Sequence, residues 1–139
     1  MDEGEHLNNR YIRYHADIYM PERILAATLD FLPPAGYSLP LSRHYKELQK
    51  GRFLPVTINM PDDFDIVDTA VIRATQAIFR VCIRFAWPST KLLDLVLILE
   101  GDHEVVSGYW NARDDKHQSL DIDRYVQSPA QAEFDEARP

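Results

Sequence analysis

The chain has 139 residues, of which 45% are hydrophobic and 27% charged, and its formal net charge at neutral pH is −7. This length and composition predict one ordinary globular domain and exclude a chain that is disordered throughout. The net acidity argues against a protein that holds nucleic acid over a broadly cationic face, although a local basic patch is compatible with it.

Cysteine usage and the termini predict a cytoplasmic protein. Cys82 is the only cysteine, which excludes an internal disulfide and a cysteine-rich zinc site and favours a reducing compartment. The first ten residues are polar and acidic, unlike a signal peptide. The longest apolar run, residues 92–99, contains Asp94 and is far shorter than the roughly 20 residues of a membrane helix. No contact with a membrane is therefore expected.

The pattern along the chain predicts an α+β fold with N-terminal helices packed on a mainly antiparallel β-sheet. Residues 11–127 are expected to form one domain between a flexible tail at 1–10 and a flexible acidic tail at 128–139, where periodicity is lost. The sequence leaves the oligomeric state open.

The first third of the domain predicts a strand and two helices. Polar and apolar residues alternate over 11–20, as in a half-buried strand. A helix should begin at Pro21 and stop before the Pro33-Pro34 pair. Ser42 fits the N-cap of a second short helix, which Gly51 should close.

The remainder predicts a sheet. Residues 53–60 and 77–87 indicate strands, and 92–100 and 105–110 should pair as an antiparallel hairpin across the turn at 101–104. Residues 65–78 fit either a helical stripe or a strand rich in β-branched residues, and their start favours a helix.

Motifs for the common cofactor-dependent enzymes are absent. The sequence has no phosphate-binding loop, dinucleotide fingerprint, serine-hydrolase elbow or pair of histidines spaced for zinc. Neither a cofactor nor a metal ion is therefore expected. Asp114, Asp115 and His117 could touch a cation, but carboxylates and an imidazole in one loop are more typical of a solvated turn.

Residues 91–125 carry the clearest functional signal. An apolar strand and hairpin are followed by a turn dense in imidazole, cation, hydroxyl and amide groups, where scaffolds tend to display reactive side chains. The segment reads Val105-Val106-x-x-Tyr109-Trp110-Asn111-x-x-Asp114-Asp115-Lys116-His117-x-Ser119-Leu120-Asp121, with Tyr125 beyond it. This pattern resembles the C-terminal half of small bacterial toxin domains of the barnase, EndoU, colicin and RelE fold, found in polymorphic and contact-dependent toxins.

The resemblance implies metal-independent cleavage of RNA, with the ribose 2′-hydroxyl attacking the adjacent phosphate. His117 would act as acid or base, and His44, in a fainter echo of the family pattern at 42–45, would be the second proton-transfer group. Arg80 or Arg84, with Lys116, would hold the phosphate. Ser119 would hydrogen-bond a phosphate oxygen. The implied partners are RNA and a cognate immunity or antitoxin protein.

Simpler readings of the same residues stay open. His117 also fits a solvated turn, His44 a structural role, and Lys116 an ordinary surface charge. Arg80 and Arg84 also fit cross-strand pairs with carboxylates. Toxin nucleases are commonly basic, whereas this chain is acidic. A non-catalytic domain of the same fold, acting as a protein-binding inhibitor or accessory protein of a mobile element, is therefore the alternative.

Overall fold

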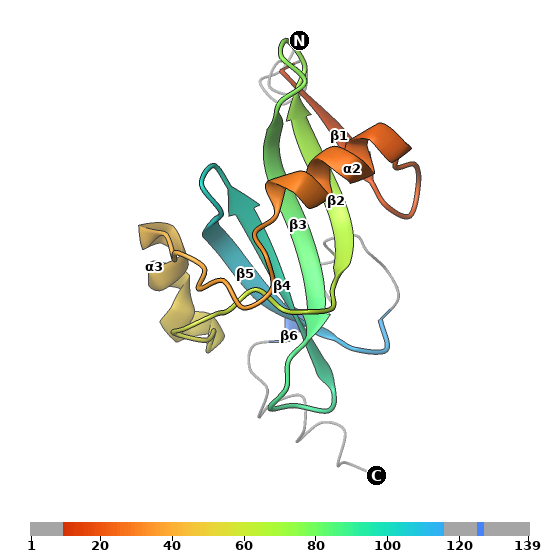
Figure 1. The fold of residues 1–139 in the computed structure, drawn as a ribbon. Coiled ribbons are helices and arrows are strands. Elements are labelled where there is room, and N and C mark those ends of the chain that lie inside the picture. The colour runs from red at the N-terminus through yellow and green to blue at the C-terminus, as the bar shows by residue number, and fades with distance from the viewer. Residues whose placement is uncertain (1–9, 116–124, 127–139) are drawn as a thin grey trace, which may run out of the picture.

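The computed structural model describes residues 10–115 and the short strand Tyr125–Val126 (Figure 1). Within these residues two helices accompany a sheet of six strands in the order β1-β2-β3-β4-β5-β6, with all neighbours antiparallel. The elements are β1 (Tyr11–His15), α2 (Glu22–Phe31), α3 (Arg43–Arg52), β2 (Asp65–Ile72), β3 (Ile78–Ala86), β4 (Leu93–Glu100), β5 (Glu104–Ala112) and β6 (Tyr125–Val126). The predicted α+β class is confirmed.

Alternation of side chains along β3 and β4 creates the main face of the sheet. Leu93, Leu95, Leu97 and Leu99 of β4 are fully buried on one side. Successive residues of a strand point to opposite faces, so this run buries every second residue in one core. The hairpin between β4 and β5 pairs as predicted, with Leu95 opposite Trp110.

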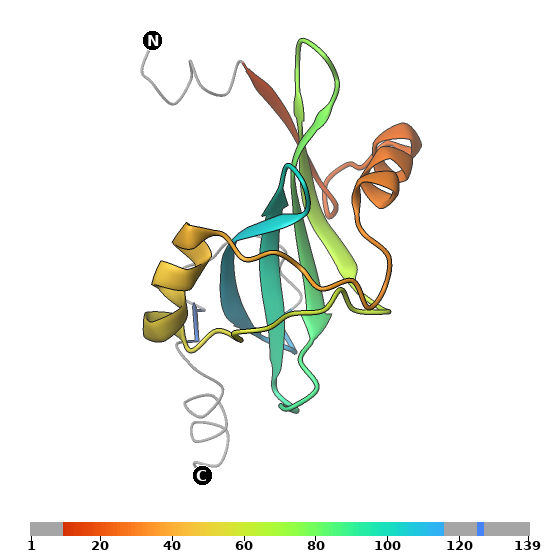
Figure 2. The same ribbon diagram turned by 60° about the vertical axis from the view of Figure 1, so that its left-hand side comes forward.

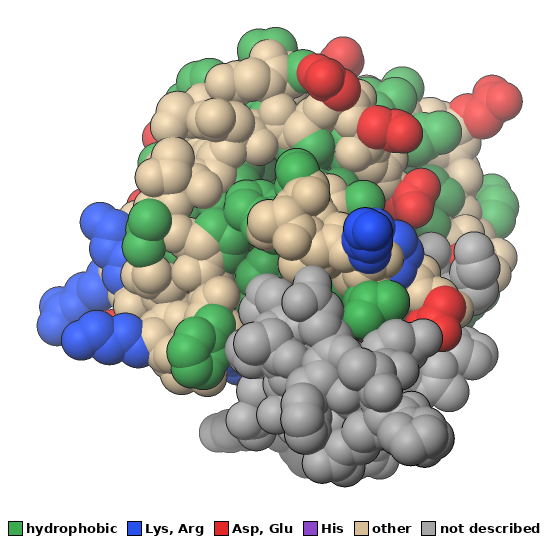
Figure 3. Space-filling view, turned by 90° about the horizontal axis from the view of Figure 1, so that it is seen from below, with side chains coloured by type: hydrophobic (Ala, Val, Ile, Leu, Met, Phe, Trp, Pro, Cys, Tyr) green, Lys and Arg blue, Asp and Glu red, His purple; other side chains and the backbone are tan. Residues whose placement is uncertain are grey.

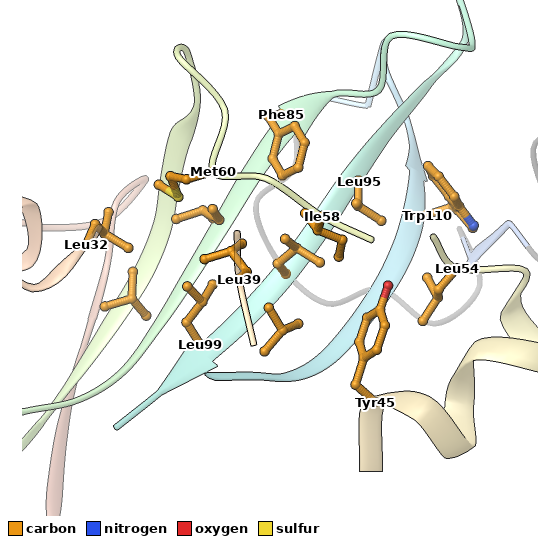
Figure 4. Close-up of a cluster of buried hydrophobic side chains, with 14 of the residues drawn as sticks. Leu32, Leu39, Tyr45, Leu54, Ile58, Met60, Phe85, Leu95, Leu99 and Trp110 are labelled. Carbon is orange, nitrogen blue, oxygen red and sulfur yellow. The ribbon is translucent and has the colours of Figure 1, made fainter. Parts of the chain in front are cut away.

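The long connection between β1 and β2 supplies the other half of this core. It contains both helices, with α2 lying over β2 and β3 and α3 beside β5. Residues 32–42 and 53–64 cross the sheet between the two helices (Figure 2). Figure 4 shows the side chains that it packs against the sheet. They are Leu32, Leu39, Tyr45, Leu54, Ile58 and Met60.

The tendency of residues 65–78 toward a helix is not realised. Residues 65–72 form β2, between β1 and β3. Val67, Thr69 and Val71 are buried there, and the Thr69 hydroxyl lies 2.9 Å from the hydroxyl of Thr28 on α2. Pairing with β1 on one side and β3 on the other makes this segment a strand, and its β-branched side chains pack well on the pleated surface.

Two predicted strand ranges are also corrected. Residues 53–60 form no strand, and only a single bridge joins Asn59 to Ser38. Leu54, Ile58 and Met60 are buried, but only the end of the segment has a partner, through backbone hydrogen bonds with residues 36–39. The first strand ends at His15 and not at residue 20, because the chain turns there and the amide of Tyr19 bonds the His15 carbonyl.

The ends of α3 show one confirmed cap and one correction. The Ser42 hydroxyl accepts a hydrogen bond from the Tyr45 amide at 3.0 Å, as expected of an N-cap. The helix does not close at Gly51 but runs on to Arg52, and Phe53 takes the left-handed conformation with φ 55°. The turn at Phe53 brings Leu54 into the core, where it is only 3% exposed.

Phe53 is an unusual residue at this position. A left-handed backbone disfavours residues with a Cβ, and helices usually end there on Gly or Asn. Phe53 is moreover 66% exposed, so core packing does not explain its presence. The position is costly for a large aromatic residue.

Phe53→Gly should leave the free energy of unfolding unchanged or raise it by up to about 1 kcal/mol, because glycine adopts this conformation without strain. Phe53→Val should lower it by about 1 kcal/mol or more, since β-branched residues tolerate positive φ least. Urea denaturation of both variants measures the difference. A glycine variant less stable than the valine variant would contradict the assignment of strain to Phe53.

Candidate anion-binding site

The predicted site residues divide into two groups. His117, Lys116 and Ser119 lie outside the described residues. Arg80 and Arg84 lie on β3, and His44 lies on α3. The described part of the chain therefore shows the surroundings of the two arginines and of His44.

Arg84 lies in a buried ion-pair cluster. Its Nε donates to Asp94 Oδ2 at 2.7 Å, and its Nη2 donates to the carbonyl of Ala112 at 2.8 Å. The side chains of Arg84 and Asp94 are only 6% and 12% exposed. Two charges that are both shielded from water interact strongly, so Arg84 is committed to this pair.

Arg113 completes the cluster from the opposite side of Asp94. Its Nε donates to Asp94 Oδ1 at 2.9 Å, and its Nη2 reaches the carbonyls of Trp87, Thr90 and Leu93. The first two carbonyls belong to the connection between β3 and β4, and the third belongs to the first residue of β4. The cluster thus ties the end of β5 to that connection, just before the segment that contains His117.

Asp94→Asn should lower the free energy of unfolding by about 3 kcal/mol or more, because it leaves the buried Arg84 without a counter-charge. The matched variant Glu100→Gln, which breaks the more exposed pair with Arg80, should cost less than about 1 kcal/mol. Urea denaturation monitored by tryptophan fluorescence compares the two. Equal losses would show that burial does not distinguish these pairs.

Arg80 is also paired. Its Nε and Nη2 both donate to Glu100 Oε2, at 3.0 and 2.6 Å, and the two residues stand opposite each other in the β3–β4 ladder. A groove of about 440 Å³ adjoins Glu100, and Asp102 and Glu104 also line it. Three carboxylates on this groove oppose a phosphate, so the surroundings of Arg80 are unfavourable for an anion. Phosphate binding by Arg80 and Arg84 remains a prediction.

His44 lies in different surroundings. It is exposed in the first turn of α3, a helix with four bases (Arg43, Lys46, Lys50 and Arg52) and one acid (Glu47), a net charge of +3. Figure 3 shows Lys and Arg side chains gathered at the side of the molecule formed by α3, while acidic side chains lie mainly on the opposite side of the view. Among the described elements, α3 therefore offers an anion the most favourable charge.

Three of these bases form a continuous row, here called the cationic stripe. Arg43, Lys46 and Lys50 are spaced i, i+3 and i+7, which puts them on one face of a helix. All three are exposed. Arg43 makes an ion pair with Glu47 at 3.3 Å, and none of the described residues pairs with Lys46 or Lys50.

The opposite face of α3 docks on β5. Tyr45 projects into the core beside Leu54 and Trp110 (Figure 4), and its hydroxyl donates to the Pro55 carbonyl at 2.7 Å. Arg52 Nη1 donates to the Gly108 carbonyl at 2.8 Å, while Trp110 Nε1 donates to the Arg52 carbonyl at 3.0 Å. Arg52 therefore holds the helix in place, and the cationic stripe faces away from the sheet.

Close approach of the helix depends on Gly108. A Cβ at this position would lie 3.2 Å from Tyr45 Cε2 and 3.2 Å from Leu97 Cδ2. Such distances are tighter than ordinary van der Waals contact, so the absence of a side chain lets Tyr45 pack directly on the strand. Burial raises the pKa of the Tyr45 hydroxyl well above its ordinary value, and it stays a neutral donor.

Sequence reasoning missed the cationic stripe and Phe53. The signal was the i, i+3, i+7 spacing of the bases in a helix that the sequence did predict. It was overlooked because the net charge of the chain is negative, and an overall balance hides a local patch.

The described residues offer little other site chemistry. Burial raises the pKa of the Cys82 thiol far above its ordinary value, and the Asp68 carboxylate adds to this effect, so the thiol stays protonated. Within residues 10–115 no group of three His, Cys, Asp or Glu side chains is arranged to hold a metal ion. Neither described helix has the length and apolar character needed to cross a membrane.

Comparison with known proteins found no matching family model, no similar curated protein and no similar solved structure. The likeness to toxin domains therefore remains a prediction based on residues 91–125.

Proposed function

We propose that this protein is a toxin-like ribonuclease domain that acts in the cytoplasm and cleaves RNA without a metal ion. The observation that carries the proposal is the exposure of His44 on the most cationic element of the described chain. An imidazole on a cationic helix suits proton transfer at a phosphate, because the cations attract the substrate and neutralise its charge.

The proposed reaction is an internal transfer. The ribose 2′-oxygen attacks the adjacent phosphorus, one imidazole accepts the 2′-hydroxyl proton, and the bond to the 5′-oxygen breaks as a second imidazole donates a proton to it. The products are a 2′,3′-cyclic phosphate and a free 5′-hydroxyl. His44 and His117 are the proposed proton-transfer pair, with Lys116 and Ser119 contacting the phosphate.

The two arginines of β3 take a revised role in this proposal. Arg84 acts on structure, because its guanidinium is committed to Asp94 and to the Ala112 carbonyl. Together with Arg113 it fixes the point where the chain leaves β5 toward His117. Arg80 is half exposed but paired with Glu100, so it would have to exchange that carboxylate for a phosphate.

Purified protein should cleave a labelled single-stranded RNA in the presence of EDTA, and should leave the 2′-O-methyl form of the same sequence intact. His44→Ala and His117→Ala should each lower the cleavage rate about 100-fold or more, because general acid and base groups contribute about that much. Gel analysis of the products, with a test for the cyclic phosphate end, measures both effects.

His15→Asn is the matched control for this experiment. His15 ends β1, an edge strand of the sheet, whereas α3 with His44 docks on β5 near the other edge. The control should cleave at the wild-type rate. Absence of cleavage, or equal activity in all three histidine variants, would refute the ribonuclease proposal.

A second candidate function is protein binding through α2, as in a domain recognised by an immunity or antitoxin protein. Its support is a set of exposed apolar side chains: Leu25 and Leu29, one turn apart on α2, and Ile18 and Tyr19 in the chain turn before that helix. Their exposed fractions are 39, 52, 84 and 66%. Apolar side chains grouped on a helix surface are typical of helix-mediated protein recognition.

The double variant Leu25→Glu/Leu29→Glu should therefore lose at least tenfold in affinity for a cognate protein partner, because charges replace the apolar contact. Val56→Glu, at a position 70% exposed and outside α2, is the control and should bind normally. Co-purification followed by titration calorimetry measures the affinities. Equal binding by both variants would exclude α2 as the contact surface.

A further inference from the structure

An exposed aromatic residue directly follows the cationic helix α3. Phe53 directly follows the last residue of the helix, three residues after Lys50, and is 66% exposed. Its backbone is held in the left-handed conformation, with its amide bonded to the Gln49 carbonyl. An exposed aromatic residue in a conformation that disfavours it breaks two local rules, and such positions tend to be functional.

The spacing of the cationic stripe suits a linear polyanion. Arg43, Lys46 and Lys50 lie about 4.5 and 6 Å apart along the helix axis, from a rise of about 1.5 Å per residue. Successive phosphates of an extended nucleic-acid strand are separated by distances of this order. Arg52 is bonded to Gly108 and lies outside the stripe. Within the stripe, Arg43 exchanges its exposed pair with Glu47 for a phosphate.

The negative net charge of the protein does not prevent such binding. At physiological ionic strength, exposed charges are screened over about 8 Å, so a bound strand responds mainly to the charges nearest to it. On α3 these are the stripe and Glu47, whose carboxylate is paired with Arg43.

From these observations we infer that the cationic stripe and Phe53 form a binding surface for single-stranded RNA. The stripe contacts successive phosphates, and the Phe53 ring stacks on an unpaired base. Stacking requires a base that is not already stacked within a duplex, which selects single strands over double helices. An acidic peptide offers charge but no base to stack, so the exposed ring favours RNA as the ligand. For the proposed ribonuclease, this surface makes single-stranded RNA the substrate. The biological role of the surface rests on the proposed function, but its binding can be measured without cleavage.

Fluorescence anisotropy with a 2′-O-methyl oligonucleotide tests the surface without cleavage, because the nucleophilic hydroxyl is blocked. The logarithm of the affinity should fall with the logarithm of salt concentration with a slope of about −2, from three phosphate contacts at about 0.7 each. Lys46→Gln and Lys50→Gln should each reduce the magnitude of this slope by about 0.7. Lys91→Gln, which removes an exposed cation from another part of the chain, should leave it unchanged.

The Phe53 variants separate stacking from charge. Phe53→Leu should weaken binding about tenfold at an unchanged salt slope, because it removes the stacked ring and no charge. Phe53→Gly should do the same, and since glycine suits the left-handed conformation its loss of binding cannot be attributed to unfolding. Thermal melting of each variant confirms that it is folded.

Two further ligands decide between classes of partner. A duplex RNA of the same length and a polyglutamate peptide should both bind at least tenfold more weakly than the single strand. Equal binding of the peptide would replace RNA by an acidic protein partner and overturn the inference. Unchanged RNA affinity in the variants of Phe53, Lys46 and Lys50 would overturn the inference as well.

Failure of this inference and failure of the proposed function are distinguishable. Tight, Phe53-dependent binding without cleavage of ordinary RNA would refute the ribonuclease proposal and support the RNA-binding surface. Cleavage that is unaffected by Lys46→Gln, Lys50→Gln and Phe53→Leu would support the ribonuclease proposal and refute the RNA-binding surface.

Discussion

Burial of the leucine side of β4 is the constraint on which the rest of the structure depends. Leu93, Leu95, Leu97 and Leu99 are fully buried, and the sheet alone would leave them in water. The cover comes from the connection between β1 and β2, which contributes both helices and the loops between them (Figures 1 and 2). Because this connection must reach across the sheet, it carries α3 to β5 and determines where that helix sits.

The docking of α3 in turn determines which of its residues can bind a partner. Tyr45 enters the core, and Gly108 gives it the room to do so. Arg52 bonds the strand, while Trp110 bonds the end of the helix. The same contacts leave Arg43, Lys46 and Lys50 facing solvent. The same packing interactions thus determine which face of the helix docks on the sheet and which charged face remains in solvent.

Charge is used in two separate ways in this molecule. In the cluster of Arg84, Asp94 and Arg113, guanidinium groups share one carboxylate and several backbone carbonyls, and the charges serve to hold two segments together. On α3 the charges of Lys46 and Lys50 are exposed, and none of the described residues pairs with them. An arginine on a strand can belong to either class, and only its neighbours decide which.

The sequence by itself determined the α+β class, the hairpin of β4 and β5, and the Ser42 cap of α3. These follow from local chemistry: alternation of apolar residues creates a half-buried strand, and a hydroxyl before a helix satisfies an unpaired amide. It also raised cross-strand pairing as an option for Arg80 and Arg84, which the ladder of β3 and β4 realises.

Tertiary structure alone decided the remainder. Residues 65–72 became a strand because β1 and β3 lie on either side. Residues 53–60 did not, because only the short segment 36–39 bonds to their end. Gly51 stayed within α3 because the burial of Leu54 sets the turn at Phe53. Pairing, burial and the choice of exposed face depend on residues distant in the sequence, and a local pattern contains no information about which of those residues will be near.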